Sequence, residues 1–322
     1  MGIFILDNMS LEVKIILLFS GVMFFMGCEK DITIDLQDTV PKIVVEGHIE
    51  PGTPPYIILT HTFPFFSYAD VETLENLFVH DAVITIFDGT DHHTLREYCS
   101  DSLPDSLTQF GALYLGVDIA DLTDHDFCIY SVSTDTANPA DILVGELGKT
   151  YTLSVTVGGF TYTATTTLTY PIPLDAISTI VHPTNDSLFH LQGTLSDPLG
   201  VESYYRVFTQ RIGIDEYLLP TFSSIFNDRL IDGQTIALLF RRGKRMGVPD
   251  IYTGYYSYGD TVVVKFCTMD RAHYEFWETA LVEIDNTGNP IAAATQIATN
   301  LKGGALGIWG AYGAIYDTVI VK

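Results

Sequence analysis

Two threonine-rich segments near the middle of the chain constrain its fold more than any other feature. Residues 149–157 and 160–168 alternate polar side chains with apolar or aromatic ones. A period of two gives a strand one solvated face and one buried face. Gly158 and Gly159 join the two segments, and paired glycines are typical of the tight turn of a β-hairpin. The sequence therefore predicts an antiparallel hairpin here and a β-sheet protein around it.

Further strand signals recur through the N-terminal half of the chain. Residues 42–49 and 56–61 are rich in β-branched side chains and are separated by a proline-rich turn. Residues 82–89 end in Asp-Gly, which favours a hairpin turn, and a second strand follows at 93–98. Short strands at regular spacing are typical of an antiparallel sandwich. We therefore predict an immunoglobulin-like β-sandwich domain at residues 38–170.

A stiff junction follows at Pro171 and Pro173, because proline fixes its own backbone angle. Residues 171–322 are predicted to form a second β-rich domain. One amphipathic helix interrupts it at residues 270–284, where apolar side chains recur with helical spacing on one face. That face carries Tyr274, Trp277, Leu281 and Ile284. The predicted strands of this domain are 187–195, 204–210, 235–240, 261–267 and 317–321. The predicted fold class is therefore all-β, with two domains and one helix.

The N-terminus carries an export signal. An apolar run begins at Ile15, follows the single basic residue Lys14, and is too short to span a bilayer. It ends at Gly27, and a small residue immediately before Cys28 resembles the cleavage site of a bacterial lipoprotein. Residues 1–27 are therefore predicted to be a signal peptide, residues 28–37 a tether, and Cys28 the lipidated residue. Acyl chains on this thiol would hold the mature protein at a membrane.

Two alternatives remain for this segment. The residues before Gly27 are Phe25 and Met26, which depart from the usual lipoprotein pattern, so an ordinary secretory leader or an uncleaved anchor helix is also compatible with the sequence. Met9 offers a second start site that would give a more compact leader.

Three cysteines follow the predicted anchor. Cys99 and Cys128 lie in the same half of the chain, and an exported protein meets an oxidising compartment. We predict that they form a disulfide, whereas Cys267 lies within an apolar strand and is predicted to be a buried thiol. Two separate buried thiols at Cys99 and Cys128 are the alternative.

Charge and motifs exclude several function classes. The formal net charge is −24, so phosphate backbones repel the chain and nucleic-acid binding is excluded. The sequence contains no nucleophile elbow, no zinc-protease helix and no reactive-cysteine arrangement. Acidic and histidine-rich loops near residues 91–93 and 121–126 lack the spacing of a zinc or calcium site. We predict a protein that is not an enzyme and that has neither a cofactor nor a bound metal.

Two aromatic clusters could recognise a partner. Residues 63–68 and 252–258 are rich in rings, which stack on sugars or dock proteins where they are exposed. Rings beside strands more often belong to the core. The candidate recognition surface is the second cluster, with Tyr252, Tyr255, Tyr256 and Tyr258.

Several segments resemble, in order along the chain, a family of Bacteroidota lipoproteins catalogued as domain of unknown function 4249. The resemblance begins with residues 44–49, 59–66, 82–89 and 148–153. It continues through residues 204–206 and 259–264. Its strongest parts are Tyr274–Thr279 and Asn300–Tyr312.

The resemblance implies an outer-membrane lipoprotein, which in this family is often encoded beside a TonB-dependent transporter. It brings no catalytic or binding residues with it. Acidic residues at Glu29 and Asp31 fit an export signal that directs such proteins to the cell exterior. We therefore expect a membrane-anchored accessory or binding partner of a TonB-dependent transporter. A glycan-binding or adhesive surface protein that uses the second aromatic cluster is the alternative.

Overall fold

The computed structural model describes residues 40–63, 71–103, 105–115, 117–133, 142–243, 254–286 and 295–322. The chain divides into Met1–Val40 and Pro41–Lys322, and the architecture below concerns the second unit. The predicted leader, the tether and Cys28 lie outside the described residues.

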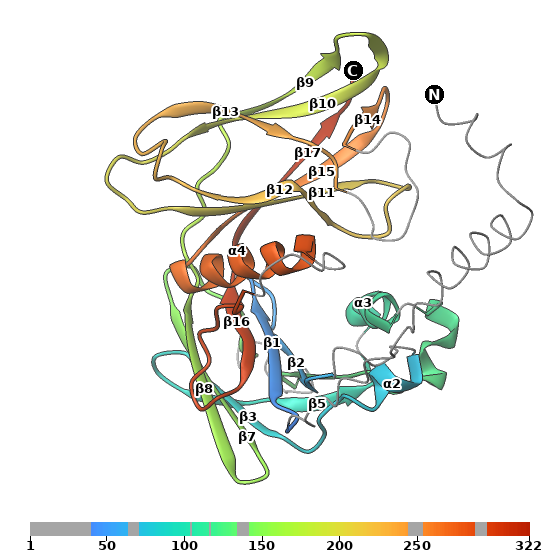
Figure 1. Ribbon diagram of the computed structural model, residues 1–322, viewed down its shortest axis with the longest axis vertical. Helices are drawn as coiled ribbons and strands as arrows, with labels where there is room; N and C mark the ends of the chain where they lie inside the picture. Colours follow the sequence, from blue (N-terminus) through green and yellow to red (C-terminus); the bar gives the residue numbers. More distant parts are fainter. Residues whose placement is uncertain are drawn as a thin grey trace, which may run out of the picture. The chain divides into compact units, whose positions relative to one another are not determined.

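Two sheets pack face to face in the N-terminal half and form a sandwich (Figure 1). Their facing side chains share one hydrophobic core, which includes Val45, Ile84, Leu153 and Trp309. The first sheet has the order β16-β1-β2-β6-β5, with β1 Ile43–Ile49, β2 Tyr56–His61, β5 Arg96–Cys99, β6 Cys128–Ser131 and β16 Leu306–Ala311. The second has the order β4-β3-β7-β8, with β3 Val83–Phe87, β4 His92–Thr94, β7 Thr150–Val157 and β8 Phe160–Thr167.

The threonine-rich hairpin is present as predicted. β7 pairs antiparallel with β8 from Thr150–Thr167 to Val157–Phe160. Gly158 and Gly159 form the turn with φ of 56° and 84°, the left-handed region that favours glycine. Alternate side chains of β7 are buried in the sandwich core, whereas threonines on the other face bond across the strands. The period-two pattern thus fixes which face of the hairpin is buried.

A second sandwich occupies the C-terminal half and has a core of its own. Large rings, among them Tyr205, Phe240, Tyr256 and Phe266, fill the space between its two sheets. In one sheet β10 pairs with β9, β13 and β14, with bounds β9 Ala176–His182, β10 Asn185–Ser196, β13 Thr235–Phe240 and β14 Tyr256–Ser257. The other has the order β12-β11-β15-β17, with β11 Tyr204–Arg211, β12 Leu219–Asn227, β15 Thr261–Met269 and β17 Gly313–Ile320.

The strand β16 crosses the predicted boundary at residue 170. It follows the second sandwich in sequence, yet it pairs parallel with β1, with Val44 opposite Leu306 and Ile49 opposite Ala311. The first core therefore takes Trp309 from the far end of the chain. The two predicted domains stay a prediction, but the strands do not separate cleanly at that residue.

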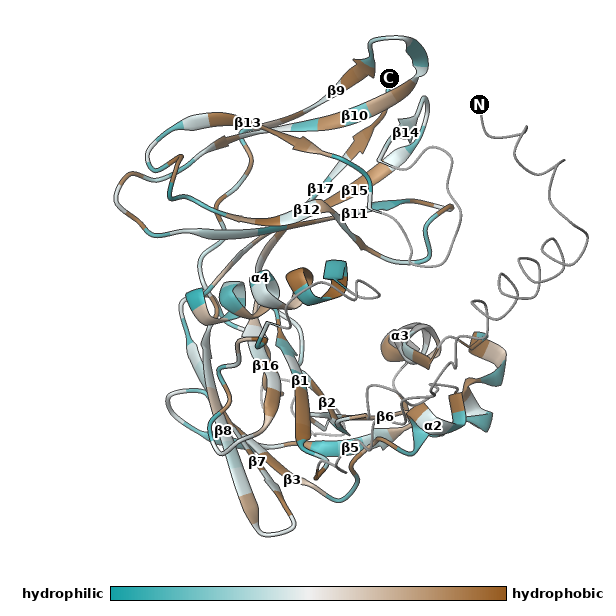
Figure 2. Cartoon of the chain, in the orientation of Figure 1, coloured by the Kyte–Doolittle hydropathy of each residue, from teal (hydrophilic) through white to brown (hydrophobic). Residues whose placement is uncertain are grey.

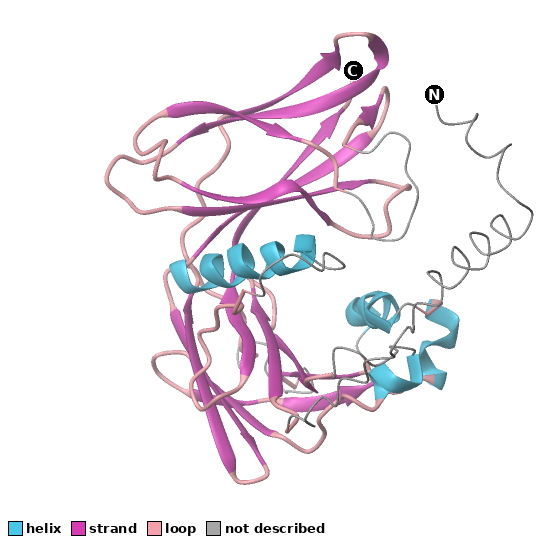
Figure 3. Cartoon of the chain, viewed as in Figure 1, coloured by secondary structure: helices cyan, strands magenta, loops and turns pink. Residues whose placement is uncertain are grey.

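The structure contains more helix than the sequence predicts (Figure 3). The predicted helix is α4, Arg271–Asn286. Its buried side chains are His273, Tyr274 and Ala280, whereas Ile284 of the predicted apolar face is 44% exposed. Two further α-helices and a 3₁₀ turn follow β2 and β5, namely α2 Val71–Glu75, α3 Asp105–Leu115 and η1 Ile119–Asp124. Within the described ranges, no helix has both the length and the apolar character needed to cross a membrane.

The hydropathy of the strands follows their position (Figure 2). β1, in the middle of its sheet, is largely apolar, whereas the edge strand β5 is hydrophilic. The all-β fold built from sandwiches is confirmed, and α4 is the longest helix among the described residues.

Candidate functional site

The disulfide joins the two cysteines that the sequence pairs. Cys99 and Cys128 lie opposite each other on β5 and β6, with an S–S distance of 2.03 Å. Cys267 is a free, buried thiol, and burial raises its pKa to about 12. A thiol with so high a pKa stays protonated at neutral pH, so Cys267 is a core residue and not a nucleophile.

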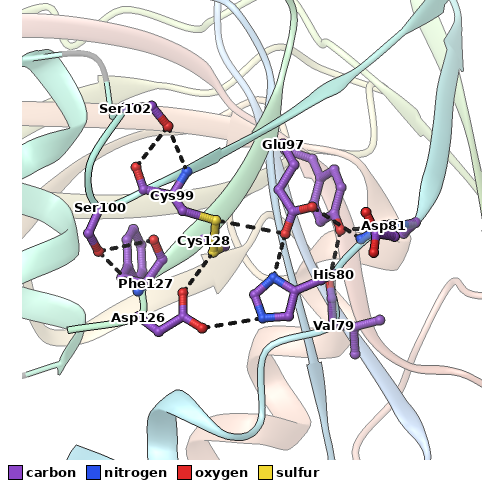
Figure 4. A network of polar contacts seen from close by, with 12 residues as sticks. Val79, His80, Asp81, Glu97, Cys99, Ser100, Ser102, Asp126, Phe127 and Cys128 are labelled. Atoms are coloured by element: carbon purple, nitrogen blue, oxygen red, sulfur yellow. Dashed lines mark hydrogen bonds and ion pairs between the residues drawn. A yellow bond between two sulfur atoms is a disulfide. The ribbon is translucent and has the colours of Figure 1, made fainter.

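Polar side chains surround the disulfide (Figure 4). His80 contacts Glu97 at 2.7 Å and Asp126 at 3.4 Å. Asp126 also lies 3.2 Å from the sulfur of Cys128, which carries no proton in a disulfide and so makes a contact without donating. The spacing of His80, Glu97 and the two sulfurs would suit a metal. Oxidation of both sulfurs removes the thiolates that a metal would need.

A second group with suitable spacing for a cation consists of Asp197, Asp228 and Asp232. Each carboxylate already accepts a hydrogen bond from the chain itself. Tyr205 donates to Asp197, the amide of Ser203 donates to Asp228 at 2.7 Å, and the amide of Gly200 donates to Asp232 at 2.6 Å. These bonds hold the loop between β10 and β11 against the loop after β12, so the cluster has a structural explanation.

The structure excludes Tyr256 from the predicted recognition surface, and the other three residues stay a prediction. Tyr256 is fully buried in the second core, and its hydroxyl donates to Thr209 at 3.0 Å. Tyr255 is half-buried and packs on His190, with ring centroids 4.4 Å apart. Tyr258 is 71% exposed, and Tyr252 lies outside the described residues. Tyr256 faces inward because it belongs to β14, which pairs with β10 in the second sandwich.

A pocket of about 790 Å³ lies in the N-terminal half, where the sequence predicts no site. Its floor is the outer face of the sheet strands β16, β1 and β2. Its walls come from α4, through Phe276 and Trp277, and from α3, through Tyr114. The floor carries Val44, Glu46, His48, Tyr56, Ile58, Leu306 and Ile308. Concave, mostly apolar pockets with a few polar groups are the usual form of a small-molecule site.

Strand alternation explains why these residues share the floor. In β1, Ile43, Val45 and Ile49 point into the sandwich core. Because side chains alternate along a strand, Val44, Glu46 and His48 point to the opposite face. The register places Glu46 opposite Ile58 on β2 and opposite Ile308 on β16. Two consecutive strands and a third from near the end of the chain thus contribute neighbouring side chains to one surface.

The helix α4 lies close to this surface because of one glycine. A Cβ atom at Gly310 would lie 2.5 Å from the ring of His273, so a larger residue there would push the helix away. Asp270 caps the helix, accepting from the amide of His273 at 2.9 Å. Its other oxygen accepts from Thr166 and Thr167 of β8, so the start of α4 is bonded to the first sandwich.

Two histidines in the pocket are held neutral. His273 donates from Nδ1 to the carbonyl of Ala311 at 3.1 Å, and its Nε2 accepts from Trp277 at 3.0 Å. Burial lowers the pKa of His273 to about 3, and the positive charge of Arg206 acts in the same direction. Burial also lowers the pKa of His48, against the opposing effect of its hydrogen bond with Glu50. Neither ring carries a charge at neutral pH.

A buried ionic cluster lies beside the pocket. Glu50 binds Lys265 directly, accepts from His48 at 2.6 Å, and accepts from Tyr316 at 2.9 Å. Burial works to raise the pKa of Glu50, but the hydrogen bond from His48 and the nearby charges outweigh it and lower the pKa to about 2. We attribute the charge effect to Lys265, since His48 is neutral. Glu50 is therefore a compensated carboxylate with every partner in place.

Arg206 is held in a cage of rings next to this cluster. Its guanidinium carbon lies 3.5 Å from the ring centroid of Trp277 and 4.8 Å from that of Phe208. It also donates to the hydroxyl of Tyr312 and is only 4% exposed. The stacking fixes Trp277 from behind, so this pocket wall is rigid.

Glu46 is the carboxylate among the described residues that line the pocket. Its one hydrogen bond within the described chain comes from the hydroxyl of Tyr114, at 3.1 Å. The side chain is exposed to solvent at the pocket, but neighbouring protein groups displace enough water to disfavour the charged carboxylate. Burial therefore raises its pKa, and the bond from Tyr114 opposes this less strongly. The carboxylate faces an aromatic cavity with an unused oxygen.

The chain matches the family described as Domain of unknown function (DUF4249) over residues 29–314 and belongs to it. No curated protein shows significant similarity to this chain. The family description assigns no activity. Two segments that carry the resemblance, Tyr274–Thr279 and Asn300–Tyr312, supply the α4 wall and the β16 floor of the pocket.

Proposed function

We propose that this member of the family is a non-enzymatic, lipid-anchored outer-membrane protein that binds a small ligand and assists a TonB-dependent transporter in its uptake. The observation that carries the ligand-binding step is the aromatic pocket between β1, β16 and α4. The anchor at Cys28 and the transporter are supported by the sequence of the leader and by the resemblance to a lipoprotein family. The protein would act on the outer face of the cell.

The chemistry of the side chains that line the pocket supports ligand binding in preference to catalysis. Its histidines are neutral, and both ring nitrogens of His273 are used by Ala311 and Trp277. Nothing within the described lining pairs a nucleophile with a base, which acyl or glycosyl transfer would need. The aromatic side chains that line the pocket favour a ligand that is held by contacts with its apolar body.

Ligand binding is tested by filling the pocket. Val44→Trp would place an indole on the floor, and Val83→Trp is the matched control on an exposed strand position, where valine is 60% exposed. Native mass spectrometry of protein purified from its own membranes should detect a bound small molecule in the wild type and the control. The Val44→Trp variant should lack it. Equal occupancy in all three proteins would contradict the proposal.

Anchoring and partnership need separate tests. Cys28→Ala should release a soluble form from the membrane fraction, whereas the wild type stays with the membrane. Affinity capture of tagged wild type from gently solubilised outer membranes should recover a TonB-dependent barrel in near-stoichiometric amount. Capture of the protein alone, with the anchor intact, would contradict the transporter role but not ligand binding.

A further inference from the structure

Two of the polar side chains that line the pocket, Glu46 and His48, offer acceptor atoms to a ligand, beside Lys42 and Gln296 in the same lining. His273 has no free nitrogen, since Ala311 and Trp277 engage both. His48 uses Nε2–H toward Glu50, which leaves Nδ1 as the acceptor of its neutral ring. Glu46 keeps one carboxylate oxygen without a partner within the described residues. A ligand that satisfies these atoms must bring donors.

The charge of Glu46 is not compensated by the part of the chain that the structure describes. No lysine or arginine there forms an ion pair with it, although Lys42 also lines the pocket. Lys265 is taken by Glu50, and Arg206 is stacked behind Trp277. A carboxylate facing a mostly apolar cavity gains most from a cationic partner.

The rings around Glu46 suit the same kind of ligand. Tyr56, His48, Tyr312 and His273 form a row of rings that runs from the strands of the floor to α4, with successive ring centroids 5.4, 5.1 and 4.5 Å apart. Aromatic faces attract both flat apolar groups and organic cations. The net charge of −24 also attracts cations to the protein as a whole.

We propose that the pocket binds a small organic cation, in which an aromatic or aliphatic body packs on the rings and an ammonium-type donor group pairs with Glu46. This inference rests on the proposed function and specifies the ligand class of the same site. Glu46 is the residue that selects charge, and the ring row with Trp277 and Phe276 selects the apolar body.

Three matched probes test it on the full mature protein in mild detergent. They are 2-(1-naphthyl)ethylamine, the corresponding alcohol 2-(1-naphthyl)ethanol, and 1-naphthylacetate, measured by isothermal titration calorimetry at pH 8. The amine is cationic at that pH. We expect the wild type to bind the amine at least about tenfold more tightly than the alcohol and to bind the carboxylate most weakly.

Glu46→Gln keeps the size of the side chain and its acceptor for Tyr114 but removes the charge. It should abolish the preference for the amine while changing the affinity for the alcohol less than about twofold. Asp317→Asn is the control, because it removes one negative charge at an exposed position outside the pocket. It should leave all three affinities as they are in the wild type.

Each other outcome overturns the charge inference. An amine that binds no better than the alcohol, or a preference that survives Glu46→Gln, shows that Glu46 does not select a cation. In either of these cases, binding of the alcohol that Val44→Trp abolishes would show that the pocket still binds ligands and that only the proposed ligand class is wrong. Failure of all three probes to bind would contradict both the charge inference and the apolar body that we assign to the ligand.

Discussion

Glu46 lies in β1 and Glu50 directly follows the same strand, yet their surroundings differ completely. Glu50 is surrounded by Lys265, His48 and Tyr316, and its pKa is lowered to about 2. Glu46 has a single bond from Tyr114, and its pKa is raised. Glu50 holds two parts of the fold together, whereas Glu46 faces the pocket.

This difference shows where a binding function can reside. A buried charge whose partners are all supplied by the chain contributes to the fold and offers nothing to a ligand. A charge left without a partner costs folding free energy, and that cost is recovered only when a ligand arrives. The carboxylate without an ionic partner, and not the larger buried cluster, therefore marks the site.

The largest expected effect comes from breaking the compensated pair. Glu50→Gln leaves the ammonium of Lys265 buried without a counter-charge, and such a change costs about 3–5 kcal/mol of the free energy of unfolding. Urea denaturation followed by tryptophan fluorescence measures it, since Trp277 stacks on Arg206 beside this cluster and Trp309 is fully buried in the first core. The double variant Glu50→Gln with Lys265→Met should recover much of the loss. A Glu50→Gln variant as stable as the wild type would remove the contrast with Glu46.

The pH dependence of the same pair is the next largest effect. The pKa of Glu50 is lowered, so its ionised form stabilises the fold above the unfolded value near pH 4.3. That stability is lost as the pH falls from there toward about 2, on the order of 3 kcal/mol in total. Between pH 5 and pH 2.5 the wild type should lose stability more steeply than Glu50→Gln. If the free energy of unfolding of the wild type and of Glu50→Gln fell equally over this pH range, Lys265 would not be holding Glu50 ionised.

The sequence predicts the strands around this contrast but not the contrast itself. Period-two alternation locates β1, β7 and β8 and indicates which of their faces is buried. It does not reveal Lys265 as the partner of Glu50, because the two are 215 residues apart and Glu50 reads as the start of a turn. Long-range pairing of this kind leaves no local pattern.

The pocket escapes prediction for a related reason. Its floor needs β16, whose glycines at 307 and 310 read as turns and weaken any strand signal. Gly307 has φ of 95°, and Gly310 makes room for His273. One signal was available: Glu46 and His48 alternate with buried residues on β1, which indicates that the second face of that strand is polar. The rings that complete the site come from α3 and α4, far away in the chain.

A smaller effect tests whether Tyr256 belongs to the core of the second sandwich. Tyr256→Phe removes a buried hydroxyl and leaves Thr209 without its partner, which should cost about 1 kcal/mol of the free energy of unfolding. Tyr258→Phe is the matched control at an exposed ring and should change stability by less than about 0.5 kcal/mol. If Tyr256→Phe leaves stability unchanged, the hydroxyl is not held in the core.

The smallest effect belongs to Glu46 and has the opposite sign from that of Glu50. Because the pKa of Glu46 is raised, its charged form destabilises the folded state at neutral pH, and protonation removes this penalty as the pH falls. Glu46→Gln should therefore be slightly more stable than the wild type at pH 8, by less than about 1 kcal/mol because solvent reaches the carboxylate. The difference should shrink toward pH 4, where the carboxyl group is protonated in both the folded and the unfolded wild type. Urea denaturation at the two pH values measures it, and a Glu46→Gln variant less stable than the wild type at pH 8 would mean that the fold itself compensates this charge. In that event no cationic ligand would be needed to neutralise it.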